Sequence, residues 1–420
     1  MLKEFYTIAF YSYLTYTSCM IKRELYLSRI RPFYHSELIK VITGIRRCGK
    51  STVILQIIDE LKRGDVSDDQ IIYINFEDYQ FQKITNPDSL YNYISTRLHR
   101  GKKTYLFIDE IQNVENFELV INSLRATSNI SIFITGSNSK LLSGELASHL
   151  SGRTVAFTLL PFTFKEYYDF QLDKGSKKRP EELLKEYLEW GGFPLVAQED
   201  NIHSKYVILA NLFDSIVLKD IVMRNNLASP LALQRVLDYV IANSSTTISG
   251  NSIAKSLNKE WKSISAPTVY DYLRYISEAC VCNVVSRYDI RGKNILSFQE
   301  KVYVCDLGFF KLRENRVKDE FNYIIETLCH NELIARGYAV YVGKTQKGEV
   351  DFIAEKEGNR KYFQVAYLLE NEKTVEREFG AFAGINDHYP KYLISMDRLQ
   401  LSRDGIIHVP LLDWLLSPDI

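Results

Sequence analysis

Short apolar runs separated by amphipathic stretches dominate the first third of the chain. Residues 38–43, 71–79, 104–108 and 131–136 are rich in Ile, Val, Phe and Tyr, which predicts buried strands. Residues 53–62 carry apolar side chains at helical spacing and predict a helix directly after the first strand. This order of elements indicates a parallel sheet covered by helices, with its ligand at the carboxyl ends of the strands.

The rest of the chain falls into three further patterns. Residues 166–229 show amphipathic helical spacing, which is broken by Gly-Gly-Phe-Pro at 191–194. Residues 230–310 predict three helices followed by a two-stranded hairpin that turns at Gly292–Asn294. Residues 322–397 predict a helix, three strands, a second helix and a last strand, which indicates a further α/β unit.

The composition narrows the class of protein. A chain of 420 residues is long enough for two to three domains. Its 52 basic and 52 acidic residues cancel, which excludes proteins that coat nucleic acid through bulk charge. The six cysteines include no C-x-x-C pair, so we expect neither a zinc ribbon nor a disulfide framework, and the usage favours a reducing cytoplasm.

The start of the chain has a composition of its own. Residues 1–19 are apolar and aromatic, but Lys3 is offset by Glu4 and no small-residue cleavage site follows. Met20 stands directly before a charged stretch, so we expect residues 1–19 to be an extension upstream of the natural start. No stretch reaches 18 consecutive apolar residues, and we expect no membrane partner.

A phosphate-binding loop is the strongest chemical signal. Residues 44–52 read GIRRCGKST and fit G-x-x-x-x-G-K-[ST] between a predicted strand and a predicted helix. Such a loop wraps phosphates with backbone N–H groups, its Lys50 reaches the β- and γ-phosphates, and its Ser51 ligates Mg²⁺. The residues expected to bind nucleotide are Gly44, Ile45, Arg46, Arg47, Cys48, Gly49, Lys50, Ser51 and Thr52.

A second half of the nucleotide site follows on later strands. Asp109 and Glu110 come directly after the strand at 104–108, as in a Walker B motif. We expect Asp109 to hold Mg²⁺ through water and Glu110 to act as the general base towards the attacking water. The strand at 131–136 ends in polar residues, among which Asn138, with Ser137 as the second choice, is expected to contact the γ-phosphate.

Several motifs together resemble one family. GIRRCGKS, INFEDY, LFIDEIQNV, LSGR at 150–153, PFTFKEY at 161–167 and GGFP at 191–194 resemble the AAA+-type prokaryotic ATPases that carry a DUF4143 C-terminal region. The resemblance implies a P-loop NTPase core of AAA+ type, a helical lid, a winged-helix domain and a C-terminal α/β domain similar to restriction endonucleases. It also implies ATP and Mg²⁺ as cofactors and makes self-assembly into a homo-oligomer an expectation.

The resemblance also suggests a division of the chain and a role for Arg153. The expected parts are the extension 1–19, the ATPase core 20–165, the lid 166–229, the winged helix 230–310 and the C-terminal domain 311–420. Arg153, in LSGR, is expected near the nucleotide or at a subunit edge, where it would offset charge in the transition state. A structural arginine that pairs with Glu145 or Glu166 is the alternative.

Two domains bear on possible partners. The third predicted helix of the winged helix carries Arg274 against Asp271 and Glu278, which is a weak charge pattern for reading DNA. The hairpin, with Arg287, Arg291 and Lys293, is better placed for phosphates. DNA binding by this domain and a packing or protein-contact role both stay open.

The C-terminal domain resembles the PD-(D/E)xK nucleases in pattern. Glu332 matches the helix acid and Asp351 the strand Asp, but Gln364 and Ala366 stand where an acid and a Lys are required. Glutamine is a poor Mg²⁺ ligand, and alanine cannot help to activate water, so we expect no nuclease activity.

These observations favour an ATP-binding protein that hydrolyses ATP as a conformational switch or motor. A DNA-binding module gated by nucleotide and a protein-interaction or signalling scaffold are the alternatives.

Overall fold

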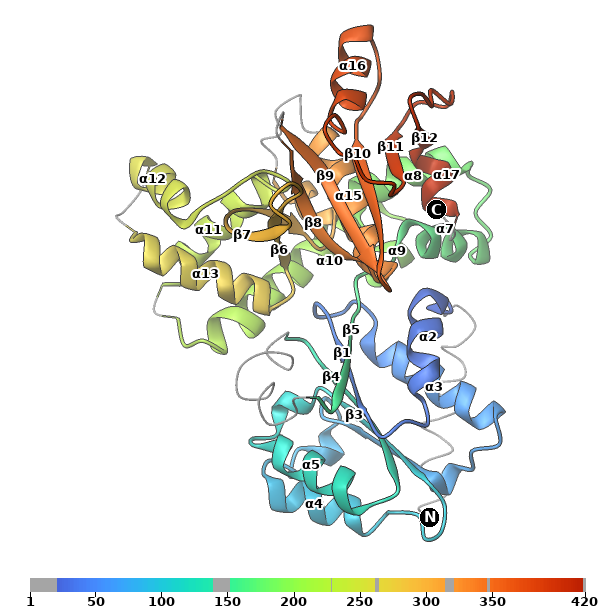
Figure 1. Ribbon diagram of the computed structural model, residues 1–420. Helices are drawn as coiled ribbons and strands as arrows, with labels where there is room; N and C mark the ends of the chain where they lie inside the picture. Colours follow the sequence, from blue (N-terminus) through green and yellow to red (C-terminus); the bar gives the residue numbers. More distant parts are fainter. Residues whose placement is uncertain are drawn as a thin grey trace.

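Two sheets organise the molecule, one in the lower half of Figure 1 and one in the upper half. The expected extension 1–19 and the first two residues of LSGR lie outside the described residues. The computed structural model describes residues 21–138, 152–227, 229–260, 264–313, 321–345 and 348–417 of the 420-residue chain.

The lower sheet has five strands, all parallel, in the order β2-β3-β4-β1-β5. The four predicted strands are confirmed, and the fifth was not indicated by the sequence pattern. Since β4 lies between β1 and β3, the carboxyl ends of these three strands meet at one edge. The strands are β1 (Ile39–Thr43), β2 (Ile71–Asn75), β3 (Thr104–Asp109), β4 (Ile130–Gly136) and β5 (Thr154–Thr158).

Helices cover both faces of this sheet, which explains why its central strands are apolar throughout. Leu90 and Ile121 bring α4 and α5 against one face, and Leu27 and Ile54 bring α2 and α3 to the core on the other. The elements are α2 (Glu24–Ile30), η2 (Arg31–Phe33), α3 (Lys50–Arg63), η3 (Asp68–Gln70), η4 (Tyr79–Phe81), α4 (Pro87–Ser95), η5 (Ile111–Asn113) and α5 (Phe117–Thr127).

The predicted helical lid is a chain of helices that ends in a π-helical segment. Its last part turns back towards the lower sheet, while α17 (Leu411–Leu416) packs against its first two helices (Figure 1). The lid elements are α7 (Phe164–Asp173), α8 (Pro180–Trp190), α9 (Pro194–Gln198), α10 (Ile202–Ser215) and the π-helix η7 (Ile216–Met223).

The predicted three helices and hairpin are present, but the hairpin is not a free wing. Its first strand pairs in parallel with β8 (Ala339–Lys344), so both hairpin strands belong to the upper sheet. One sheet therefore crosses the division expected at residue 310. The elements are α11 (Pro230–Ala242), α12 (Gly250–Glu260), α13 (Ala266–Glu278), β6 (Cys282–Asp289) and β7 (Asn294–Val304).

The upper sheet is mixed, with seven strands in the order β12-β11-β10-β9-β8-β6-β7. Apolar residues of α15 and α16 cover it. The predicted helices and strands of this region are confirmed, and the last strand, β12, is additional. The remaining elements are α14 (Gly308–Lys311), α15 (Phe321–Ala335), β9 (Glu349–Lys356), β10 (Asn359–Val365), α16 (Glu372–Gly380), β11 (Lys391–Ser395) and β12 (Ile406–Pro410).

The Gly-Gly-Phe-Pro break joins the lid to the end of β7. Gly191 has φ +74°, and a Cβ there would lie 1.9 Å from Asp306 Oδ1. The Asp306 carboxylate accepts hydrogen bonds from the N–H groups of Gly192 and Gly308, each at 2.8 Å. Burial raises the pKa of Asp306 to about 7, and these two hydrogen bonds oppose the shift. The motif is therefore required for close packing.

We expect Gly191→Ala to lower the free energy of unfolding by about 2–3 kcal/mol, because it adds both a clash and backbone strain. Gly380→Ala is the matched control, since Gly380 ends a helix, has no positive φ and leaves its Cβ position open. Urea unfolding of both variants checks this. Equal midpoints for the two would contradict the packing role of Gly191.

Among the described residues, no helix combines the length and apolar character needed to span a membrane.

Candidate functional site

The phosphate-binding loop joins β1 to α3 and places Lys50 at the first position of the helix. Gly49 has φ +105°, a left-handed conformation that favours glycine directly before the helix. Lys50 is 4% exposed, and its Nζ donates to the carbonyls of Gly44 (3.0 Å) and Ile45 (3.3 Å). The ammonium group thus lies inside the loop, where phosphates would be cradled.

Lys50 faces the acidic residue that follows β3. Its Nζ lies 3.6 Å from Oε1 of Glu110, and both side chains are buried. Burial lowers the pKa of Lys50, but the carboxylates of Glu110 and Asp109 outweigh it and leave the pKa above its ordinary value. Burial raises the pKa of Glu110, but the Lys50 charge and other contacts bring it below its usual value. Both groups are therefore charged at neutral pH.

Asp109 and Ser51 are brought together as the two expected metal ligands. The Ser51 hydroxyl hydrogen-bonds to the Asp109 carboxylate, and so does the hydroxyl of Thr135 at the end of β4. Burial raises the pKa of Asp109, and these two hydrogen bonds oppose the shift. A hydroxyl and a carboxylate are oxygen ligands of the kind that Mg²⁺ prefers, so the pair fits this ion.

Glu110 is held in a special backbone conformation at the strand end. Its φ is +56°, and its N–H donates to the Thr135 hydroxyl at 3.0 Å. The Gln112 side-chain amide donates to the Glu110 carboxylate. Gln112 lies two residues after Glu110 within the LFIDEIQNV motif, yet the sequence analysis gave it no role. A strained backbone fixed by hydrogen bonds is typical of functional positions.

A cavity of about 270 Å³ opens beside these residues and extends to the lid. Arg46 of the loop, Glu110 and residues of η7 contribute to its lining. The lining residues are Arg46, Glu77, Glu110, Gln112, Asn113, Lys219, Asp220, Met223 and Arg224. The sequence analysis missed the lid residues because nothing in their pattern indicates that they reach the loop.

The remaining loop residues divide between packing and exposure. Cys48 is fully buried, and burial raises the pKa of its thiol, so it packs and is not a thiolate. Ile45 is also buried, whereas Arg47 is exposed with φ +66°. A Cβ at Gly44 would lie 2.1 Å from the carbonyl oxygen of Leu159, so its glycine serves packing as well. Thr52 lies half-buried in the first turn of α3.

A buried arginine outside the phosphate-binding loop is hydrogen-bonded to the loop backbone. Arg23, 1% exposed, donates from Nη1 to the Cys48 carbonyl (2.9 Å) and from Nη2 to the Leu160 carbonyl (2.8 Å). Its Nε lies 2.7 Å from Oε1 of Glu166. The sequence analysis did not single out Arg23. Its contacts link the loop to the PFTFKEY motif.

The polar end of β4 lies at the same edge, but Arg153 does not. Ser137 and Asn138 are both buried, and Ser137 donates to Asp220 at 3.2 Å. Arg153 comes just before β5, whose first residue pairs with Ile39, so it lies at the opposite end of the sheet, about 20 Å from the loop. Its side chain is exposed and donates to Asn122 at 3.3 Å. Within one chain the structure therefore corrects the expectation that Arg153 lies near the nucleotide.

Comparison with known proteins places this arrangement in a family. Residues 36–168 match the family model described as an AAA domain. An uncharacterized protein of Haemophilus influenzae is 36% identical over 406 residues, which cover 96% of this chain and 100% of that protein. The chain belongs to this family of AAA-domain proteins. The uncharacterized protein MJ1544 of Methanocaldococcus jannaschii is 35% identical over 357 residues, 82% of this chain and 78% of that protein.

The fold of the AAA-domain protein is shared with a solved structure. The Walker-type ATPase PABY2304 of Pyrococcus abyssi aligns with a TM-score of 0.50 and 14% identity, over 70% of this chain and 95% of that chain. This likeness concerns the fold alone. Residues 181–318 match a domain of unknown function, DUF8612, which differs from the DUF4143 region expected from the sequence.

A second charged cluster lies on the upper sheet of the AAA-domain protein. Lys301 on β7 lies 2.9 Å from Glu326 and 2.5 Å from Glu349. Tyr303 donates to Glu326 at 2.8 Å. Burial raises the pKa of Asp351, as does Glu326, while Lys301 opposes the shift. Glu326, which pairs with Lys301, is therefore the acid of α15 that takes part in this cluster.

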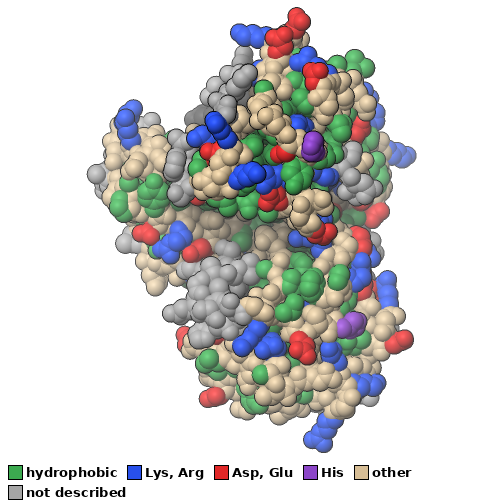
Figure 2. Space-filling view, in the orientation of Figure 1, with side chains coloured by type: hydrophobic (Ala, Val, Ile, Leu, Met, Phe, Trp, Pro, Cys, Tyr) green, Lys and Arg blue, Asp and Glu red, His purple; other side chains and the backbone are tan. Residues whose placement is uncertain are grey.

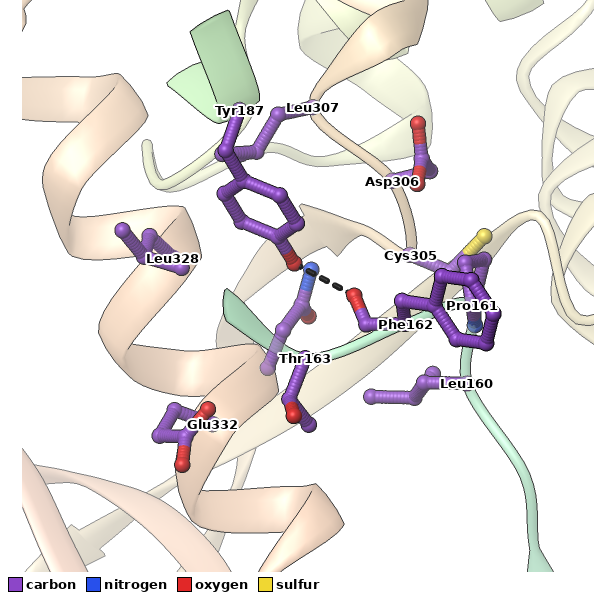
Figure 3. A pocket seen from close by; sticks show the side chains of 11 residues that line it. Leu160, Pro161, Phe162, Thr163, Tyr187, Cys305, Asp306, Leu307, Leu328 and Glu332 are labelled. Atoms are coloured by element: carbon purple, nitrogen blue, oxygen red, sulfur yellow. Dashed lines mark hydrogen bonds between the residues drawn. The ribbon is translucent and has the colours of Figure 1, made fainter. Parts of the chain in front are cut away.

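This finding corrects the match of Glu332 to a nuclease acid. Glu332 lies 2.8 Å from Arg336 and lines a small buried pocket beside Thr163 and Tyr187, away from the cluster (Figure 3). Six residues along a helix turn the side chain by about 240°, so Glu326 and Glu332 point in different directions.

The cluster does not fit the Mg²⁺ that the nuclease resemblance implies. The Lys301 ammonium already lies between two carboxylates; burial lowers its pKa, but the surrounding carboxylates outweigh this and raise it. The Gln364 side chain donates a hydrogen bond to Glu378 (2.9 Å) and accepts one from the Asp351 N–H (3.2 Å). The Ala366 side chain has no polar group. The Lys301 ammonium offsets the charge of these carboxylates and so weakens their attraction for a divalent cation.

We therefore expect the full-length protein with Mg²⁺ to leave supercoiled plasmid DNA intact. Agarose electrophoresis over a range of Mg²⁺ concentrations checks this, with Asp351→Asn as the matched variant. Metal-dependent nicking that Asp351→Asn abolishes would contradict this account of the cluster.

Proposed function

We propose that the protein binds ATP and hydrolyses it in a Mg²⁺-dependent reaction at the loop between β1 and α3. One observation carries this proposal. The Lys50 ammonium lies 3.6 Å from the Glu110 carboxylate, and the Ser51 hydroxyl is hydrogen-bonded to the Asp109 carboxylate beside them. This is the set of groups that phosphoryl transfer from a nucleoside triphosphate requires.

Binding in this proposal is the task of the loop. The N–H groups of residues 44–52 and the N-terminus of α3 surround the phosphates, and Lys50 exchanges its two carbonyl partners for phosphate oxygens. When bound, Mg²⁺ would supply positive charge that offsets the charge of the phosphates. Ser51 and Asp109 are the residues that would hold it.

Hydrolysis in this proposal depends on Glu110. Its carboxylate is ionised and lies at the edge where the terminal phosphate would be, so it can accept a proton from the attacking water. Gln112 fixes its direction. Ser137 and Asn138 directly follow β4 at this edge, and we keep Asn138 as the proposed contact to the γ-phosphate.

DNA binding is not part of the proposal, because among its described residues the hairpin keeps only Arg291 and Lys293 as exposed basic side chains for it. Arg287 pairs with Glu349 inside the upper sheet, and Arg274 lies 3.0 Å from Asp271 and 3.7 Å from Glu278. Figure 2 shows basic and acidic side chains intermixed over the face that it presents. We propose instead that the protein acts as a switch or motor for a protein partner. In this proposal Arg153 lies at a subunit edge.

We expect Lys50→Ala to weaken ATP binding at least about tenfold, since it removes the cation that pairs with the phosphates. The measurement is the rise in melting temperature on adding ATP and Mg²⁺, which should occur in the wild type and vanish in Lys50→Ala. Exposed Lys102→Ala is the matched control and should keep the rise. An equal rise in Lys50→Ala would place nucleotide binding elsewhere.

A further inference from the structure

A single carboxylate connects the lid with the phosphate-binding loop. Asp220 lies on η7 (Ile216–Met223), the π-helical segment that continues α10, and it is 2% exposed. π-Helical turns inside helices frequently mark functional positions. Asp220 is thus a buried charge placed against the catalytic edge by an unusual backbone.

The partners of Asp220 come from the phosphate-binding loop and from the polar end of β4. Its Oδ1 accepts from the Ser137 hydroxyl at 3.2 Å and lies 3.6 Å from Nη1 of Arg46. Arg224, one turn further along the same segment, lies 3.8 Å from Oδ1. Arg46 is also paired with Glu77 at 2.9 Å, at the end of the β2 segment. The loop arginine is therefore held by two carboxylates.

The carboxylate is not fully satisfied by these contacts. Oδ2 of Asp220 is buried without a hydrogen-bond partner among the described residues, and the same holds for Nη1 of Arg224. Burial raises the pKa of Asp220, and the charges of Arg46 and Arg224 oppose the shift. Both residues line the cavity beside Glu110, so the cavity wall presents unused hydrogen-bonding capacity.

The charges around the cavity are balanced without nucleotide. Three cationic side chains (Arg46, Lys219, Arg224) and three anionic ones (Glu77, Glu110, Asp220) line it. A terminal phosphate between Lys50 and Glu110 would bring negative charge next to Arg46 and Ser137. A carboxylate and a phosphate compete for the same donors and repel each other.

We infer that Asp220 takes the place of the γ-phosphate on Arg46 and Ser137, so that ATP, unlike ADP, must displace it and thereby release the lid from the loop. This inference rests on the proposed function, because it concerns nucleotide at the same site. Asp220 acts as a specificity residue: it lowers the affinity for the triphosphate relative to the diphosphate. The position of η7 then reports whether a γ-phosphate is present.

The first test compares the affinities of a non-hydrolysable ATP analogue and ADP, each with Mg²⁺, in full-length wild type and Asp220→Asn. Asparagine keeps the shape but removes the charge that competes with phosphate. We expect the analogue to bind at least about fivefold more tightly to Asp220→Asn, and ADP to change less than about twofold. Asp214→Asn, an exposed acid on α10, is the matched control and should change neither affinity.

The second test uses the unaltered protein. Hydrogen–deuterium exchange of residues 216–223 should rise with the ATP analogue and stay at the nucleotide-free level with ADP, because only the triphosphate releases the segment. Equal exchange with both nucleotides, or an unchanged affinity ratio in Asp220→Asn, would overturn the inference. Binding of both nucleotides that Lys50→Ala abolishes would in that case leave the proposed function standing. No binding of either nucleotide to wild type would overturn both.

Discussion

Glu110→Gln should bind ATP with Mg²⁺ but hydrolyse it at least about 100-fold more slowly than the wild type. The amide keeps the size of the side chain and can still contact Gln112, but it cannot accept a proton from water. Because Glu110 lies 3.6 Å from Lys50, loss of its charge should not weaken the attraction between Lys50 and the phosphates. Phosphate release under steady-state conditions and ATP-induced thermal stabilisation measure the two effects.

The matched control for this variant is Glu115→Gln. Glu115 is an exposed glutamate five residues further along the same segment, outside the cavity. Its substitution should change neither hydrolysis nor binding. Hydrolysis by Glu110→Gln at the rate of the control would show that another group accepts the proton, and it would remove Glu110 from the mechanism.

Arg23→Met should lower the free energy of unfolding by about 3–5 kcal/mol. Methionine fills part of the space but leaves the buried Glu166 carboxylate without its cation. It also leaves the carbonyls of Cys48 and Leu160 without their donor. Because Cys48 belongs to the phosphate-binding loop, the same change should weaken ATP binding. Urea unfolding measures the first effect, and nucleotide titration measures the second.

Two further variants isolate the buried pair. Arg63→Met breaks the exposed pair between Arg63 and Asp59 on α3, whose side chains are 77% and 55% exposed, and should change stability by less than about 0.5 kcal/mol. The double variant Arg23→Met/Glu166→Gln should lose at least about 1 kcal/mol less than the sum of its single variants. Additive losses would mean that the two side chains contribute independently.

The parts of the molecule that the sequence predicts best are those whose chemistry is local. The loop at 44–52 carries its glycines, lysine and serine within nine residues, and the order strand, loop, helix is visible in the apolar pattern. Asp109 and Glu110 were found for the same reason, since they directly follow a buried strand. Parallel strands then bring both motifs to one edge, as the structure confirms.

Residues that reach the site from distant segments were not predictable in the same way. Arg23 and Asp220 lie 25 and 172 positions from Cys48 in the sequence. Both side chains reach the phosphate-binding loop only through tertiary packing. A lone arginine before a helix, or a lone aspartate in an amphipathic stretch, has the same local pattern as a solvated residue. Only the folded chain distinguishes them.

The upper sheet illustrates two other limits of sequence patterns. Glu326 and Glu332 stand on one helix, and the pattern alone does not say which of them faces Asp351. The hairpin formed by β6 and β7 was correctly predicted as a local unit. Its first strand also pairs in parallel with β8, about fifty residues later in the chain. This pairing depends on long-range register, which the local sequence pattern does not indicate.

The most direct measurement is ATP hydrolysis by the purified full-length protein, with and without Mg²⁺, beside Lys50→Ala. Our account predicts phosphate release that requires Mg²⁺ and falls to background in Lys50→Ala. Release that persists unchanged in Lys50→Ala, or a wild type that neither binds nor hydrolyses ATP, would contradict it.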